Sequence, residues 1–246
     1  RYPTGGAVLE SAAELRSNLQ LARAVYDPDH TDPALDAMVL VGHSLGGLVA
    51  KLQVVESRDL LWKQAAYRPL EEVRTTPDIR LRLSRDFFFE PVPGVSRVVF
   101  IGTPHRGSGM ARRLSGRLGS SLVRYSGEVK DQYRELMAAN RDIFKPEIQR
   151  SRPTSVNLVE PTNPFLLALL DMPITRCAPY HTIAGTYIDL PWGEPSDGVV
   201  PLSSARLAGA QSELFVPASH EHLHRDDESV AELARILRQH AASPMR

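Results

Sequence analysis

Residues 37–47 read AMVLVGHSLGG, and this stretch decides which fold we expect. Its first five residues form a continuous apolar run, which is typical of a strand that is covered on both faces of a parallel sheet. After Ser44 the apolar residues return to helical spacing, at Leu45, Leu48, Val49, Leu52 and Val55. The stretch therefore predicts a strand, a tight turn at Ser44 and a helix.

Three later segments resemble this strand, and each ends in a loop rich in Gly, Pro or polar residues: Arg97–Ile101, His181–Ala184 and Glu213–Val216. An amphipathic helix is expected from Val8 to a stop near Asp27. A final helix is expected around residues 230–237, with Asp226 or Asp227 as its N-cap. Strands that alternate with helices predict an α/β fold, with a mostly parallel sheet and flanking helices.

Two segments interrupt this alternation. Residues 57–95 and 109–179 are charged and helical in pattern, and we expect the second to be a helical cap or lid inserted into one domain of residues 1–246. Its basic stretch at 112–124 indicates solvated surface. Asn163 and Pro164 predict the start of a short helix, apolar on nearly all sides, that carries Phe165 and Leu166. That helix either packs in the core or lines a substrate cleft, and the sequence leaves both open.

Composition excludes several classes of protein. Lys and Arg total 29, and Asp and Glu also total 29, so no overall charge draws the chain to nucleic acid. No apolar run approaches the roughly 18 residues that are needed to span a bilayer. Cys177 is the only cysteine, which rules out a disulfide within the chain. A single cysteine does not identify the compartment of the protein, and no targeting signal is visible in the sequence.

The turn at Ser44 has the composition that a strand-to-helix elbow requires. Such a turn tolerates no side chains two residues to either side of its serine, and Gly42 and Gly46 meet this condition. The serine hydroxyl would then be exposed as a nucleophile. The backbone N–H of Leu45, at the start of the following helix, would face the same reacting centre and donate to a developing oxyanion.

Two further motifs accompany this elbow, TPHRGS at 103–108 and SDGVVP at 196–201. Together with GHSLGG they resemble the lipase and esterase branch of the α/β-hydrolases, over essentially the whole chain. The resemblance implies a serine hydrolase that cleaves carboxylic esters through an acyl-enzyme on Ser44 and needs no cofactor. It implies a small-molecule or lipid ester as substrate.

In that family the catalytic acid follows a late strand and the histidine comes last, so the resemblance assigns these roles to Asp197 and His220. Asp189 and Glu194 are the reserve acids. His222 is the alternative base, because the loop after Val216 contains three histidines at alternate positions. This spacing, without cysteine or a clear carboxylate partner, does not indicate a metal site.

His43 and His105 are further candidates for the border of the cleft. His43 fills the variable position of the elbow, where packing is the simpler interpretation. His105 follows the second strand, at the end of the sheet where α/β folds place their sites. Other functions fit the same residues: acyl transfer to an alcohol, thioester hydrolysis, or a hydrolase-like binding module without activity.

One expected part of such a site has no counterpart before Ser44. The family's second oxyanion donor comes from a loop after an earlier strand, usually marked by His-Gly, and no such segment precedes Ser44 here. The first strands are missing as well, so residues 38–41 are expected to form an exposed apolar edge. We therefore expect this chain to be the C-terminal part of a longer protein whose N-terminal segment is needed for full activity.

Overall fold

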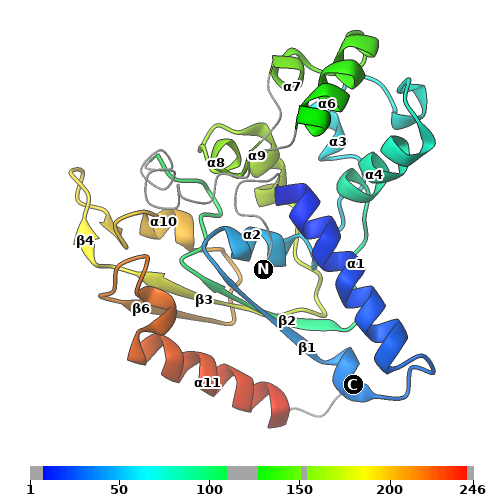
Figure 1. Cartoon of the computed structure of the whole chain (residues 1–246). Helices are drawn as coiled ribbons and strands as arrows, with labels where there is room; N and C mark the ends of the chain where they lie inside the picture. Colours follow the sequence, from blue (N-terminus) through cyan, green and yellow to red (C-terminus); the bar gives the residue numbers. More distant parts are fainter. Residues whose placement is uncertain (1–7, 110–126, 151–153, 243–246) are drawn as a thin grey trace.

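The computed structural model of the chain describes residues 8–109, 127–150 and 154–242. Its centre is a parallel four-stranded sheet in the order β1-β2-β3-β6 (Figure 1). The strands are β1 (Met38–His43), β2 (Val95–Ile101), β3 (Tyr180–Gly185) and β6 (Ser212–Val216). All four coincide with the predicted apolar runs, so the expected α/β class is confirmed. The basic stretch at 112–124 lies outside the described residues.

Helices cover both faces of this sheet. On one face lie α1 (Val8–Tyr26) and α2 (Leu45–Lys51), and on the other lies α11 (Asp227–Ala242) (Figure 1). The α11 face is closed by Ile236, which packs against Val99 and Ile101 of β2. Asp226 is the N-cap of α11, because its carboxylate accepts the amides of residues 228 and 229 at 3.0 and 3.4 Å.

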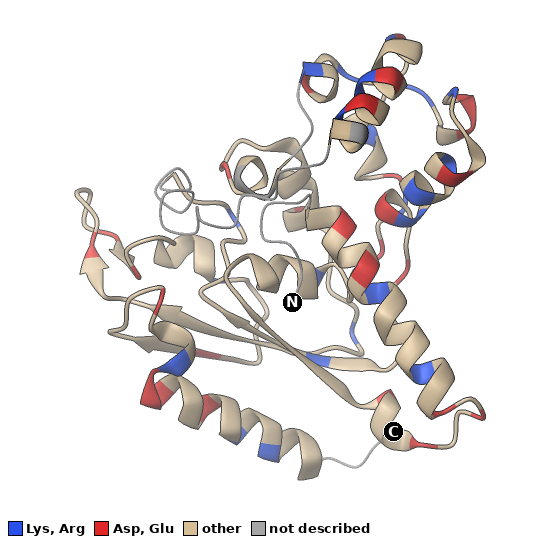
Figure 2. Cartoon of the chain, viewed as in Figure 1, with Lys and Arg blue, Asp and Glu red and all other residues tan. Residues whose placement is uncertain are grey.

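The two interrupting segments form a second helical layer, on the same side of the sheet as α2 (Figure 1). Residues 57–95 contribute α3 (Trp62–Ala65), η2 (Leu70–Glu72) and α4 (Pro77–Phe87). Described parts of 109–179 contribute α6 (Gly127–Ala139), α7 (Pro146–Arg150), α8 (Ser155–Leu158) and α9 (Pro164–Asp171). The outer helices carry both signs of charge (Figure 2), as solvated surfaces do. No helix among the described residues has the length and apolarity to cross a membrane.

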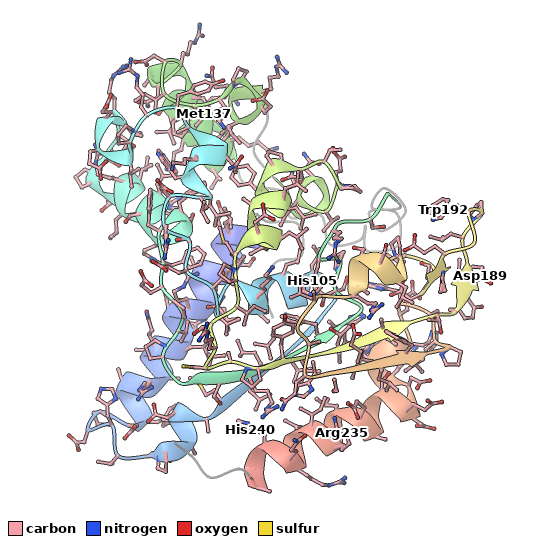
Figure 3. The ribbon with its side chains drawn as sticks, turned by 180° about the vertical axis from the view of Figure 1, so that it is seen from behind. His105, Met137, Asp189, Trp192, Arg235 and His240 are labelled. Atoms are coloured by element: carbon pink, nitrogen blue, oxygen red, sulfur yellow. The ribbon has the colours of Figure 1, made fainter. Side chains whose placement is uncertain are left out.

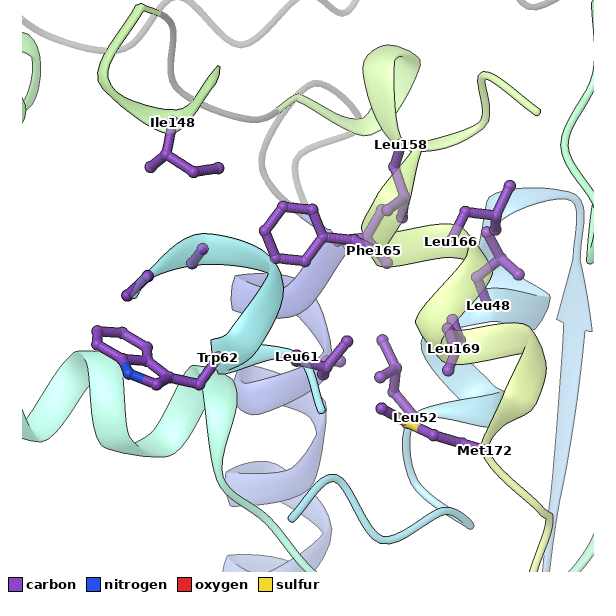
Figure 4. Close-up of a cluster of buried hydrophobic side chains, with 14 of the residues drawn as sticks. Leu48, Leu52, Leu61, Trp62, Ile148, Leu158, Phe165, Leu166, Leu169 and Met172 are labelled. Atoms are coloured by element: carbon purple, nitrogen blue, oxygen red, sulfur yellow. The ribbon is translucent and has the colours of Figure 1, made fainter. Parts of the chain in front are cut away.

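The short helix α9 belongs to the core. Asn163 caps it by accepting the amides of residues 165 and 166 at 2.9 and 3.3 Å, as the Asn-Pro pair predicts. Leu166 is fully buried in one apolar cluster with Leu48 and Leu52, two residues that come shortly after the turn at Ser44 in the sequence (Figure 4). Of the two alternatives that the sequence left open for this helix, Leu166 fits packing in the core, because its side chain joins the two layers.

Phe165 points elsewhere. It lines an apolar pocket of about 150 Å³ between the start of α1 and the helices of the second layer, together with Leu83, Phe87, Leu136, Met137 and Leu158. Trp62 packs against Phe87, one of these lining residues. Its ring meets Phe87 edge-on, with centroids 5.2 Å apart, and its Nε1 donates to the carbonyl of Arg68 at 2.8 Å.

A small hairpin that the sequence analysis did not predict follows β3. Its strands are β4 (Ile188–Asp189) and β5 (Pro195–Ser196), and its tip presents Trp192 with 68% of the residue exposed (Figure 3). The indole Nε1 donates to Glu194 Oε2 at 2.9 Å. The hairpin leads directly into Asp197, and α10 (Leu202–Ala205) comes next.

Strand β1 lies at the edge of the described sheet, where it pairs with β2. Its residue Val41 is 45% exposed, and Met38, Val39 and Leu40 are only partly buried. Among the described residues, this apolar strand therefore has one open side, as expected for residues 38–41.

The face of the sheet toward α11 contains a buried polar network centred on Arg97. Its guanidinium donates to His181 Nε2 at 2.6 Å, to Gln211 Oε1 at 2.7 Å and to His240 Nδ1 at 3.1 Å. His240 Nε2 in turn donates to the carbonyl of Ala37 at 2.8 Å. Burial, followed by the charge of Arg97, lowers the pKa of His181 to about 4, so this ring is neutral at pH 7. The network ties the last helix to the start of β1.

Candidate active site

Ser44 lies at the junction of β1 and α2, in a strained backbone conformation. Its φ is 55° and its ψ is −128°, a region that residues other than glycine rarely adopt. Gly42 makes the turn possible, since a Cβ at that position would lie 2.5 Å from the Cα of Gly47. The strain and the close packing hold the serine hydroxyl at the carboxyl end of the sheet.

Three of the predicted residues meet through side-chain hydrogen bonds. Ser44 Oγ lies 2.8 Å from His220 Nε2, and His220 Nδ1 lies 2.7 Å from Asp197 Oδ2. Their residues are 9%, 5% and 2% exposed, in the order serine, histidine, aspartate. Since a carboxylate only accepts, the proton of neutral His220 belongs on Nδ1. Its Nε2 is then free to accept the proton of the serine hydroxyl.

The turn around Asp197 orients its carboxylate. Oδ1 accepts the amides of Val199 at 2.9 Å and Val200 at 2.6 Å, which leaves Oδ2 for the imidazole. Ser196 closes the turn, because its Oγ donates to the carbonyl of Val200 at 3.0 Å and accepts the amide of Gly198 at 3.1 Å. The turn formed by SDGVV thus fixes the carboxylate of Asp197 so that one of its oxygens faces His220.

The alternative site residues lie elsewhere. His222 is exposed and its Nδ1 is 3.0 Å from Ser219 Oγ, so it is His220 that contacts Ser44. Asp189 is exposed on β4 (Figure 3). Glu194 is engaged by the Trp192 indole and by the amide of Ser203, at 2.9 and 3.0 Å.

Gly102, which the sequence did not mark as a site residue, lies beside the hydrogen bond between His220 and Asp197. Its φ is +54°, and a Cβ there would lie 3.2 Å from Asp197 Oδ2 and 3.3 Å from His220 Nδ1. A residue with a side chain would be strained in this conformation and would press on the hydrogen bond between the two. One feature of the sequence could have pointed to Gly102: it directly follows the second predicted strand, beside the carboxyl end of the first.

His43 and His105 differ sharply in their surroundings. His43 Nε2 is 3.0 Å from the carbonyl oxygen of His220, and its ring centroid lies 4.9 Å from that of His220. Burial, followed by the charge of His220, lowers the pKa of His43 to about 4.

His105 (Figure 3) is fully buried, and its ring meets that of Phe100 edge-on, with the ring centroids 4.7 Å apart. Burial, and then the charge of Lys51, lowers its pKa well below the usual value. The chain after β2 turns this side chain inward, and this burial does not support a place for His105 at the border of a cleft.

Leu45 is the first residue of α2, so its amide N–H has no partner within that helix. This amide adjoins the serine and is the predicted oxyanion donor. Within the described ranges, no three His, Cys, Asp or Glu side chains are grouped so as to hold a metal ion. The arrangement has the parts for nucleophilic attack by a serine that a histidine deprotonates.

The layered sheet, with a serine at the turn between a strand and a helix, has the architecture of an α/β-hydrolase. No family model and no curated protein sequence matches the chain. Among solved structures it is similar to a lipase of Bacillus licheniformis, BlEst2. In the mature form, the match covers 95% of this chain and 75% of the lipase, with 16% identity and a TM-score of 0.53.

The propeptide form of the same lipase matches with a TM-score of 0.52 and 16% identity, and there this chain spans 41% of the lipase's length. At such low identity the likeness concerns the fold. It confirms that the chain has the α/β-hydrolase fold of a bacterial lipase.

Proposed function

We propose that this protein is a serine hydrolase of carboxylic esters that acts through an acyl-enzyme on Ser44. The observation that carries the proposal is the continuous hydrogen-bond chain from Ser44 Oγ through His220 to Asp197, with distances of 2.8 and 2.7 Å. The fold supports the proposal, because α/β-hydrolases place their nucleophile at this turn.

Acylation begins when Ser44 Oγ attacks the carbonyl carbon of the ester while its proton passes to His220 Nε2. The electron pair of the C=O bond moves to the oxygen, and the Leu45 amide donates to this oxyanion. When the intermediate collapses, the C–O bond to the leaving group breaks. The proton on His220 moves to that oxygen, an alcohol departs, and the acyl group stays on Ser44.

Deacylation repeats these steps with water. His220 takes a proton from the water molecule, the hydroxide oxygen attacks the acyl carbon, and the acid leaves as Ser44 regains its proton. Asp197 keeps the imidazole in the required tautomer and stabilises its positive charge at each stage. In this proposal residues 109–179 act as a cap, and Phe165 belongs to the part of the site that receives the apolar portion of an ester.

A fluorophosphonate probe tests the nucleophile. We expect mass spectrometry to find one label, on the peptide that contains Ser44, and to find none in Ser44→Ala or His220→Ala. The matched control is His222→Ala, which removes a neighbouring histidine and is expected to label at the wild-type rate. Labelling that survives Ser44→Ala, or is lost in the control, would contradict the assignment.

Substrate competition tests the reaction class. We expect p-nitrophenyl esters to release nitrophenol and free acid in equal amounts, with the acid also the main product when a primary alcohol is added. Ester formation from the added alcohol would instead indicate an acyltransferase, and preference for an acyl thioester would indicate a thioesterase. A folded protein that neither labels nor hydrolyses any of these would be a binding module.

A further inference from the structure

The main chain of His220 is held as firmly as its side chain. The amide N–H of His220 donates to the carbonyl of Asp197 at 2.9 Å, and its carbonyl accepts from His43 Nε2 at 3.0 Å. The main chain of His220 is therefore bonded to His43 and Asp197, just as its side chain is bonded to Ser44 and Asp197. Both polar groups of this peptide segment are fixed by the segments that carry the other two candidate catalytic residues.

The alternation of β1 explains why His43 reaches this loop. Side chains of a strand alternate between its faces, so Gly42 and His43 point to opposite sides of the sheet. Gly42 faces α2, since a Cβ there would meet the backbone of Gly47. His43 therefore shares the α11 face with Val39, which packs against the cluster that contains Leu223 of the His220 loop.

The loop encloses the His43 ring from two sides. The ring of His220 lies 4.9 Å away at an interplanar angle of 36°, and the ring of His224 lies 4.8 Å away at 43°. A carbonyl oxygen can only accept, so His43 must carry its proton on Nε2. Its lowered pKa, of about 4, keeps the ring neutral at pH 7, although Asp197 nearby acts in the opposite direction. A neutral ring at this distance does not repel the imidazolium that His220 becomes during reaction.

We propose that His43 is a positioning residue: its Nε2–H holds the carbonyl of His220 and so keeps the His220 imidazole in line with Ser44 Oγ. The inference rests on the proposed function for its effect on rate. The bond itself concerns only His43 and the His220 loop, and can be observed without any turnover.

Three substitutions separate the hydrogen bond from simple packing. His43→Gln places an amide N–H near the position of Nε2, His43→Leu keeps the bulk without a donor, and His43→Asn keeps a donor that is too short to reach. We expect His43→Leu and His43→Asn to lower kcat for a p-nitrophenyl ester by about 10- to 100-fold, the range that a small misplacement of a catalytic group produces. His43→Gln should stay within about threefold of wild type, with KM nearly constant throughout.

The control variant is His222→Leu, an equal change on an exposed residue of the same loop, and it is expected to keep the wild-type kcat. Thermal unfolding of each variant shows whether it is folded. Equal losses in His43→Gln and His43→Leu, or no loss in His43→Leu, would overturn the proposal. So would a loss that appears in KM alone.

Imidazole ¹H–¹⁵N spectra of the wild type give a readout that needs no activity. We expect His43, assigned through its loss in His43→Gln, to show the Nε2–H tautomer at pH 7 and to remain neutral down to about pH 5. A protonated ring or the Nδ1–H tautomer at pH 7 would exclude the bond. If the wild type proves inactive, the proposed function fails, while these spectra still decide whether His43 holds the His220 loop.

Discussion

Replacing Asp197 by Asn tests the candidate triad most directly, because the structure determines which way the new amide points. The amides of Val199 and Val200 donate to Oδ1 at 2.9 and 2.6 Å, so that position can hold only the oxygen of the asparagine. The NH₂ group must therefore occupy the position of Oδ2, 2.7 Å from His220 Nδ1. There it donates, and Nδ1 is forced to accept.

This reversal disables the base. With Nδ1 accepting, the single proton of neutral His220 moves to Nε2, which then donates to Ser44 Oγ and can no longer take its proton. In a serine triad the wrong tautomer lowers kcat by about 10⁴, which corresponds to roughly 5.5 kcal/mol of activation free energy. We expect a loss between about 10³ and 10⁴ for Asp197→Asn, with the fold retained since the substitution changes no volume.

The assay is the second-order rate constant for fluorophosphonate labelling of Ser44 at pH 7.5, followed by mass spectrometry. Asp189→Asn is the matched control, because it makes the same change on the exposed strand β4. We expect this control to label at the wild-type rate. A loss below about thirtyfold in Asp197→Asn, or a large loss in Asp189→Asn, would refute the assignment of the acid.

Three further changes follow from the geometry. Gly102→Ala should slow labelling by about tenfold, because the new Cβ would press on Asp197. It should also lower the thermal midpoint, because a φ of +54° strains alanine by about 1 kcal/mol. Labelling at the wild-type rate would show that the site does not need an unsubstituted Cα at residue 102. The free energy of unfolding should fall as the pH drops from 6.5 toward 4, by up to about 3 kcal/mol from His181, since this ring is neutral when folded and protonates when unfolded. Urea unfolding at pH 7 and pH 4.5 measures this fall, which should be smaller in His181→Gln. Asp226→Ala should cost about 1 kcal/mol by removing the cap of α11, and an unchanged urea midpoint would contradict it.

Apolar periodicity was enough to predict the sheet and its flanking helices. The runs at 97–101 and 181–184 became strands that are buried on both faces, as their apolar residues predict. The run at 213–216 also became a strand, although Glu213 and Phe215 are exposed on one of its faces. The end of α2 was harder to place. Helical spacing continues to Val55, yet the helix ends at Lys51 and Val55 instead forms a bridge with Ile174. An apolar turn that is buried between layers has the same pattern as a helix.

The resemblance to the lipase and esterase family, through its order of serine, aspartate and histidine, predicted the side chains that meet at the candidate site, but it did not predict the groups that support them. The carboxylate of Asp197 is held by the backbone amides of Val199 and Val200. Nearly every residue type has such an amide, so no pattern of side chains in the sequence predicts these hydrogen bonds. The bond of His43 joins segments 177 positions apart. The β4–β5 hairpin has strands of two residues each, too short for an alternating pattern to be recognised.

The two tryptophans of the chain give it two built-in optical probes. Trp62 is buried among Phe87, Phe88 and Phe144 of the second helical layer, whereas Trp192 stands at the exposed tip of the hairpin that leads into Asp197. Their emission should separate into a short-wavelength component that iodide does not quench and a long-wavelength component that it does. Loosening of the helical layer and movement beside the candidate acid can then be followed independently, in the unlabelled protein and in a single fluorescence experiment.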